Sequence, residues 1–127
     1  LRKAIKIKPN LAEAHSNLGY LFKALGKLRE AEVSLRKAIK IKPDYANAYY
    51  NLGNILIDLG KFQEAEVFLR KAIDLKSDYA EAYYNLGNIL RILGKLEEAK
   101  LCSEKIISIR SWSILGSYSF NREMKLD

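Results

Sequence analysis

The nine residues AYYNLGNIL at positions 48–56 occur twice in this chain, because residues 82–90 repeat them without a change. The nine residues LRKAIKIKP at positions 1–9 likewise recur at 35–43. Both pairs of copies are 34 residues apart, and residues 12–45 share 20 of 34 positions with residues 46–79. A constant period of this length indicates an array of similar structural units. We place the units at 12–45, 46–79 and 80–113, after the end of a partial unit at 1–11 and before a tail at 114–127.

Each unit is expected to be a pair of helices joined by a short turn. The first helix should end at a glycine that accepts a left-handed backbone conformation, and the glycines in question are Gly26, Gly60 and Gly94. Pro9 and Pro43 should stop the second helix, because proline lacks the N–H that a helix interior requires. A short polar side chain should cap the following first helix, and these caps are expected at Asn10, Asp44 and Asp78.

The apolar residues of the first helices lie on one face. In the second unit they are Ala48, Leu52, Ile55, Leu56 and Leu59, which form a single stripe at helical spacing. One hairpin cannot bury both of its faces, whereas stacked hairpins can. The pattern therefore predicts an all-α solenoid of antiparallel helix hairpins with nearest-neighbour contacts.

The positions of the small and large residues within each unit resemble the tetratricopeptide repeat family. A Leu-Gly pair stands at positions 7 and 8 of every unit, and an alanine at position 20 (Ala31, Ala65, Ala99). The pattern weakens in the third unit at Ser103, Ile106 and Ser111, which suggests that the regular array ends there. The resemblance implies a right-handed superhelix of about three repeats whose first helices line a concave groove.

In that family the groove binds protein or peptide partners. The side of these first helices opposite their apolar face, which lines the groove in the family, is rich in amides and tyrosines. An asparagine recurs at position 6 (Asn17, Asn51, Asn85), in a column similar to the asparagine ladder of O-linked N-acetylglucosamine transferase arrays. A primary amide can pair with the backbone of an extended peptide, and tyrosine adds flat apolar area. The predicted peptide-binding residues are Asn17, Tyr20, Tyr50, Asn51, Asn54, Tyr84, Asn85, Asn88 and Arg91. The alternative is that the amides bond to one another or to neighbouring helices.

The sequence contains no signal for catalysis or for a cofactor. The chain has one His and one Cys, and its glycines do not have the spacing of a phosphate loop. A dedicated clamp for a carboxylate is not expected either, because positions 5 and 6 carry Ser16, Tyr50, Tyr84 and asparagines instead of lysine or arginine. We therefore expect a non-catalytic scaffold, or alternatively the recognition arm of a larger enzyme of glycosyltransferase or sulfotransferase type.

The net charge of +7 is concentrated at the start of the chain. Residues 1–42 hold 11 basic against 3 acidic residues (+8), and residues 43–127 hold 11 against 12 (−1). The lysines repeat with the array and lack interleaved aromatics, so nucleic acid is not the expected partner. No membrane segment is visible, which favours a cytoplasmic protein, and self-association through the ends of the array is a further possibility. The tail beginning near Trp112 is expected either to cover the last hairpin as a cap or to be a disordered remainder.

Overall fold

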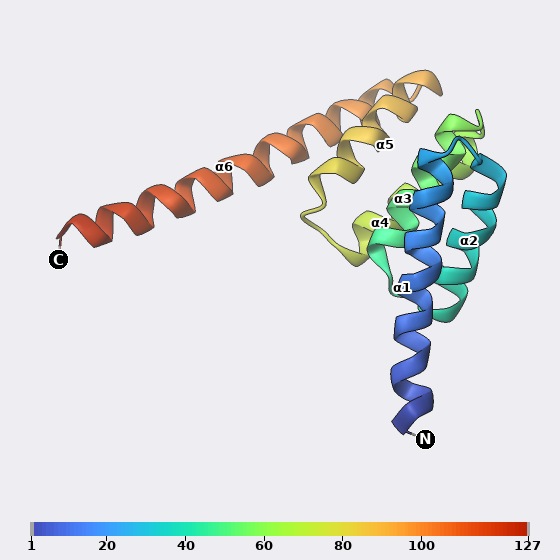
Figure 1. Ribbon diagram of the computed structural model, residues 1–127. Helices are drawn as coiled ribbons and strands as arrows, with labels where there is room; N and C mark the ends of the chain where they lie inside the picture. The colour runs from blue at the N-terminus through green and yellow to red at the C-terminus, as the bar shows by residue number, and fades with distance from the viewer. Residues whose placement is uncertain (1, 127) are drawn as a thin grey trace.

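The computed structural model describes the backbone of residues 2–126 and the side chains of residues 11–114. The backbone forms helices and no strand over that range (Figure 1). In chain order the helices are α1 (Arg2–Ala24), α2 (Leu28–Ile41), α3 (Ala46–Asp58), α4 (Phe62–Leu75), α5 (Ala80–Ile92) and α6 (Leu96–Leu126). The predicted all-α class is confirmed.

The helices pack in chain order as three hairpins, α1–α2, α3–α4 and α5–α6. Each hairpin also packs on the next, through α2 on α3 and α4 on α5. In addition the backbone of α1 comes close to that of α3, and that of α3 to that of α5, whereas the backbones of the described second helices α2, α4 and α6 do not come close to one another. The first helices therefore stand closer together than the second helices. This spacing curves the array so that the first helices lie on its inner side.

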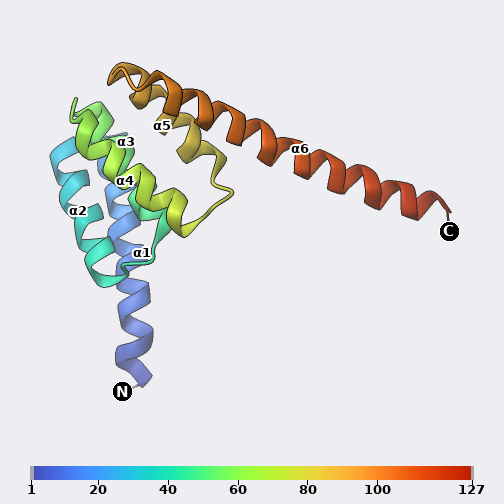
Figure 2. The ribbon, with the colours of Figure 1, turned by 180° about the vertical axis from the view of Figure 1, so that it is seen from behind.

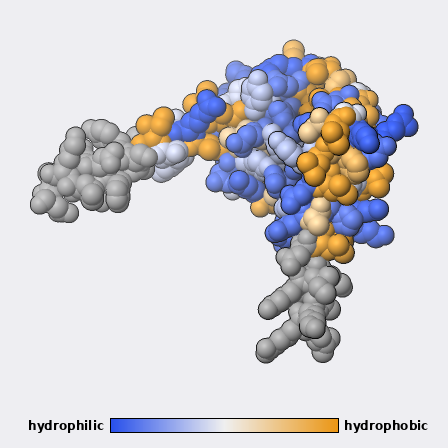
Figure 3. Space-filling model, in the orientation of Figure 1, coloured by the Kyte–Doolittle hydropathy of each residue, from blue (hydrophilic) through white to orange (hydrophobic). Residues whose placement is uncertain are grey.

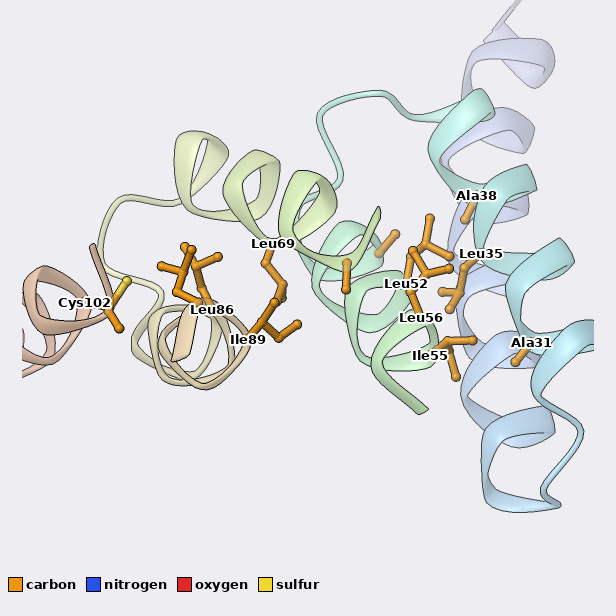
Figure 4. Packing of buried hydrophobic residues seen from close by; sticks show 14 residues of the cluster. Ala31, Leu35, Ala38, Leu52, Ile55, Leu56, Leu69, Leu86, Ile89 and Cys102 are labelled. Atoms are coloured by element: carbon orange, nitrogen blue, oxygen red, sulfur yellow. The ribbon is translucent and has the colours of Figure 1, made fainter. Parts of the chain in front are cut away.

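The hydrophobic core is continuous along the array and includes residues of all three hairpins (Figure 4). Leu35 of α2 meets Leu52 and Leu56 of α3, and Leu69 of α4 meets Ile89 of α5. Small residues let the two helices of a hairpin approach closely. A methyl group added to Gly53, for example, would lie 2.8 Å from the side chain of Leu69.

The three predicted helix-ending glycines adopt the expected conformation. Gly26, Gly60 and Gly94 have φ angles of 76°, 76° and 78°, a region that only glycine enters without strain. After α1, the N–H of Lys27 donates to the carbonyl of Phe22 over 2.8 Å, and the N–H of Gly26 donates to Lys23 over 2.9 Å. This pair of bonds is a Schellman motif, which satisfies the last carbonyls of the helix.

The predicted aspartate caps are wrong. The residues that precede α3 and α5 are Tyr45 and Tyr79, and neither caps its helix with a side chain. Asp44 and Asp78 lie one residue earlier, inside a backbone turn. The N–H of Tyr45 donates to the carbonyl of Lys42 over 3.2 Å, and the turn one unit later has the same bond over the same distance. This turn moves the start of the helix one residue beyond the aspartate.

Pro9 does not end a helix, because α1 runs from Arg2 to Ala24 through Pro9 and through the expected cap Asn10. The identical residues 35–43 leave the helical conformation after Ile41. The local sequence is the same in both places, so the tertiary surroundings decide whether the helix ends before the proline. After Ile41 the chain reverses because α3 packs back on α2. Proline removes one helical hydrogen bond but does not by itself reverse the chain.

The tail does not form the expected cap. Helix α6 continues to Leu126 and runs away from the other helices in both views (Figure 1, Figure 2). Trp112 and Ile114 are 74% and 68% exposed. The turn sequence of residues 42–45 is replaced by Arg-Ser-Trp-Ser at 110–113, which neither carries a proline nor stops the helix. The remaining apolar residues of the expected cap lie outside the described side chains: Leu115, Tyr118 and Phe120.

Candidate functional site in the groove of the first helices

The first helices α1, α3 and α5 surround a hollow of about 370 Å³ on the inner side of the array. Its apolar part comes from isoleucines of α3 and α5, and its polar part comes from amides and one pair of opposite charges. The lining residues are Lys23, Tyr50, Asn54, Ile57, Asp58, Asn85, Asn88, Ile89 and Ile92. This hollow is an open depression formed by three consecutive hairpins.

A second hollow, of about 340 Å³, continues the first toward the end of the array. It is lined by Tyr50, Ala80, Glu81, Tyr84, Asn85, Ile106 and Arg110. Tyr50 and Asn85 line both hollows. The two hollows therefore lie next to each other on either side of these residues, and together we call them the groove.

Hydrogen bonds hold the residues between the two hollows in place. The Nδ2 atom of Asn85 donates to Oδ1 of Asn54 over 2.6 Å and to the hydroxyl of Tyr50 over 3.4 Å. The ring of Tyr50 also packs against Tyr79, with 4.9 Å between the ring centroids. The hydroxyl of Tyr79 in turn donates to Oδ1 of Asn47 over 2.8 Å. The shape of the groove at this point is thus set before any ligand arrives.

Burial of Tyr79 has a clear electrostatic consequence. Removal of its hydroxyl from water, together with the charges that Tyr50 and Glu81 carry when ionised, raises the pKa of Tyr79 to about 12. The hydroxyl therefore keeps its proton, and its donor role in the bond to Asn47, to a more alkaline pH than an ordinary tyrosine does.

The structure brings together five of the nine predicted peptide-binding residues. Tyr50, Asn54, Tyr84, Asn85 and Asn88 line the groove. Two amides of the predicted stripe do bond to each other across α3 and α5, as the alternative interpretation held.

The other four predicted residues lie outside the two hollows. Asn17 and Tyr20 are exposed on α1, and Asn51 is half-buried on α3. Arg91 is exposed and donates to Asn88 over 2.7 Å. The amide pair of Asn54 and Asn85 is not repeated one unit earlier, because Tyr20 takes the position of Asn54 there.

Some groove residues were not among those predicted. Lys23, Ile57, Asp58 and Ile92 lie on the same side of the first helices as the predicted residues, so their helical spacing is the signal that identifies them. Ile106 and Arg110 of α6 had no such signal, because the repeat pattern fails in this part of the chain.

The charges of the groove balance locally. The first hollow contains Lys23 and Asp58, and the second contains Glu81 and Arg110. Among the residues with described side chains, no group of three His, Cys, Asp or Glu is arranged to hold a metal ion. In the same part of the chain, no helix has the length and apolar character that crossing a bilayer requires.

Comparison with known families identifies the repeat. A family model described as TPR repeat matches residues 1–26, 19–60 and 53–90, and another described as tetratricopeptide repeat matches residues 80–111. The chain belongs to the tetratricopeptide repeat family. None of the curated proteins compared with this chain matches it.

Several solved structures are similar to this chain over most of its length. The second TPR of Spaghetti (RPAP3) bound to the HSP90 peptide SRMEEVD has a TM-score of 0.80 and 27% identity, covering 84% of this chain and 98% of that one. The first TPR of Spaghetti with the same peptide has a TM-score of 0.76 and 28% identity, covering 79% of both chains. MamA has a TM-score of 0.77 and 34% identity, covering 87% of this chain and 64% of MamA.

Proposed function

We infer that this tetratricopeptide array is a non-catalytic scaffold that holds an extended segment of a partner protein in its groove. The observation that carries this function is the pair of adjoining hollows along the first helices, which share Tyr50 and Asn85. An elongated depression of this kind fits a peptide chain better than a compact small molecule. Two of the similar structures are TPR domains with a bound peptide, which supports the same function.

The groups in the groove suit contacts with a peptide backbone. Asn85 and Asn88 each carry two N–H donors and a carbonyl acceptor, and a peptide bond offers the matching groups. Because the Nδ2 atom of Asn85 already contacts Asn54 and Tyr50, its carbonyl oxygen is the group left for a ligand N–H. Backbone recognition of this kind is independent of the ligand's side chains, so specificity must come from the walls of the hollows.

Those walls favour a segment with apolar, uncharged side chains. Ile57, Ile89 and Ile92 line one hollow, and Ile106 and the rings of Tyr50 and Tyr84 line the other. Each hollow is lined by one cation and one carboxylate, so neither hollow carries an excess positive charge. We therefore expect this chain to prefer an apolar segment over the acidic peptide SRMEEVD that the Spaghetti domains bind.

Three synthetic peptides test this preference by fluorescence anisotropy. The first is SRMEEVD; the second replaces its acidic residues by amides and has an amidated C-terminus; the third carries leucine at the same three positions. We expect the leucine peptide to bind most tightly and SRMEEVD most weakly. Binding that is tightest for SRMEEVD and is lost on amidation would contradict the proposed preference, and no binding of any peptide would contradict the proposed function.

The location of the site is tested with variants of the full chain. Tyr50→Ala combined with Asn85→Ala should weaken binding of the leucine peptide by about tenfold or more, because both residues line both hollows. Val67→Ala removes an exposed apolar side chain of α4, outside the groove, and serves as the matched control. Equal loss of affinity in the two proteins would place the site elsewhere.

A further inference from the structure

Ion pairs join the second helix of one hairpin to the start of the second helix of the next. At the junction of the first two hairpins, Glu32 and Arg36 of α2 pair with each other over 3.0 Å. Arg36 also pairs with Glu64 over 3.2 Å, and Glu32 pairs with Lys61 over 3.6 Å. Each charge therefore has a partner within its own helix or across the junction, and the order at this junction is acidic then basic along α2.

The same arrangement recurs one unit later with the same residue types. Arg70 pairs with Glu66 over 3.0 Å and with Glu98, and Lys95 pairs with Glu66 over 3.0 Å. Burial alone would raise the pKa of Glu66, but hydrogen bonds from Lys95 and Arg70 outweigh it and hold the pKa below its usual value. The carboxylate thus stays charged at the junction. The same order of charges, acidic then basic along the second helix, is therefore paired with the next hairpin at both junctions.

The third hairpin reverses that order. Lys100 stands at the position of Glu32 and Glu66, and Glu104 stands at the position of Arg36 and Arg70. Both side chains are exposed on α6. The α5–α6 end of the array therefore presents a basic then an acidic group where the two earlier hairpins present an acidic then a basic one.

Apolar side chains on the same face of α6, by helical spacing, lack the neighbour that covers their equivalents in the part of the chain whose side chains are described. Ile107 is 63% exposed, whereas its equivalents Ile39 and Ile73 are half-buried against the following hairpin. Leu96 is 65% exposed, whereas its equivalent Phe62 is half-buried. The α5–α6 end thus combines exposed apolar side chains with an order of charges opposite to that of the two earlier hairpins.

We propose that the α5–α6 end is a docking surface for a helical partner whose charges run opposite to those of this chain's own hairpins. Such a partner places a carboxylate opposite Lys100 and a cation opposite Glu104, and it covers Ile107 and Leu96 with an apolar face. Its position on α6 corresponds to that of hairpin α3–α4 on α2. The order of charges selects the helix that docks here. A helix with the charge order of this chain's own hairpins would place like charges opposite each other, and their repulsion would disfavour its binding.

A second copy of this chain does not meet that requirement in a head-to-tail arrangement. Its N-terminal end offers an apolar face, with Leu18 and Leu21 exposed, and Figure 3 shows hydrophobic residues gathered over the α1 side. The charges at that end are Lys27 and Glu30, the equivalents of Lys61 and Glu64. Lys27 would meet Lys100, and Glu30 would meet Glu104. The reversed order therefore disfavours docking of Lys27 and Glu30 of a second copy against Lys100 and Glu104.

The required partner can be made from the chain itself, since a reversal at the N-terminal end supplies the complementary order. We expect the full-length variant Lys27→Glu with Glu30→Lys to self-associate about tenfold more strongly than the native chain in sedimentation velocity at low salt. The variant Lys100→Glu with Glu104→Arg restores the order of the other hairpins and should associate to a similar extent. Both associations should weaken in 0.5 M salt.

The quadruple variant that combines both reversals is the decisive control. It places like charges opposite each other again, so we expect it to associate no more strongly than the native chain. All four substituted positions are exposed, and circular dichroism melts check that each protein is folded. The proposal is overturned if neither double variant associates more than the native chain, or if the quadruple variant associates as strongly as the doubles.

Discussion

At the scale of single residues, the close contact between the two helices of a hairpin depends on which side chain faces the glycine. In the second unit an added methyl at Gly53 would lie 2.8 Å from Leu69, but in the third unit an added methyl at Gly87 would lie 3.4 Å from Cys102. The third unit is looser because Ser103 takes the place of the leucine. The same substitution should therefore have different consequences in the two units.

We expect Gly53→Ala to lower the free energy of unfolding by about 1–2 kcal/mol, because Leu69 is buried and has no room to move aside. Gly87→Ala should be neutral or stabilising by up to about 1 kcal/mol, because alanine favours the helix and the space is present. Urea denaturation of the two variants measures the difference. Equal destabilisation by both would show that the two hairpins are packed alike.

A second residue-scale prediction concerns alkaline pH. The pKa of Tyr79 is raised to about 12 in the folded protein, above the value of about 10 expected in the unfolded chain. The unfolded chain therefore loses this proton first. The contribution of Tyr79 to stability is fully present below pH 10 and is lost as the pH rises toward 12.

Tyr79→Phe should remove this part of the pH dependence, so that its stability falls less steeply than that of the native protein between about pH 10 and 12. At pH 7 the variant should be less stable by about 1 kcal/mol, because the hydrogen bond to Asn47 is lost. Urea melts at a series of pH values measure both effects. Parallel curves for the two proteins above pH 10 would argue against the raised pKa.

At the scale of elements, the sequence predicted helix ends best where a residue's own backbone preference decides them. The glycines after α1, α3 and α5 end their helices because glycine, which has no Cβ, adopts the left-handed conformation without steric strain. Pro9 did not act as a helix end, since α1 continues through it, whereas the identical stretch before Pro43 ends where α3 packs back on α2. The end of α6 was also missed, because the turn sequence that ends α2 is absent from α6.

The exposure of α6 beyond the last hairpin leads to a spectroscopic prediction. Trp112 is the single tryptophan of the chain and is 74% exposed. We expect iodide to quench its fluorescence nearly as efficiently in the folded protein as in urea, and the emission maximum to shift little on unfolding. A blue-shifted, poorly quenched tryptophan in the folded protein would instead support the cap that the sequence suggested.

At the scale of the whole molecule, the place of a hairpin in the array decides what a residue contributes. Leu52 and Leu18 occupy the same position of the repeat, but Leu52 is 0% exposed and Leu18 is 40% exposed. Leu52 is covered by the preceding hairpin, and the α1–α2 hairpin has no such cover over Leu18 in the described part of the chain. In a stacked array, stability resides largely in such contacts between neighbours.

We therefore expect Leu52→Ala to cost about 2–5 kcal/mol, as for other buried leucines, and Leu18→Ala to cost about 1 kcal/mol or less. Thermal or urea melts followed by circular dichroism measure both. A cost for Leu18→Ala that approaches that of Leu52→Ala would show that the N-terminal face is covered in solution.

The period, the pairing of helices and the family follow from the sequence alone, because a fixed spacing of apolar and small residues leaves stacking as the way to bury both faces of each hairpin. Part of the groove follows in the same way, since Tyr50, Asn54, Tyr84, Asn85 and Asn88 were recognised from helical spacing. The bond between Asn54 and Asn85, the groove residues of α6 and the open faces at the two ends depend on how hairpins are placed against one another. That placement is decided by contacts between residues about 30 positions apart, which a local pattern does not contain.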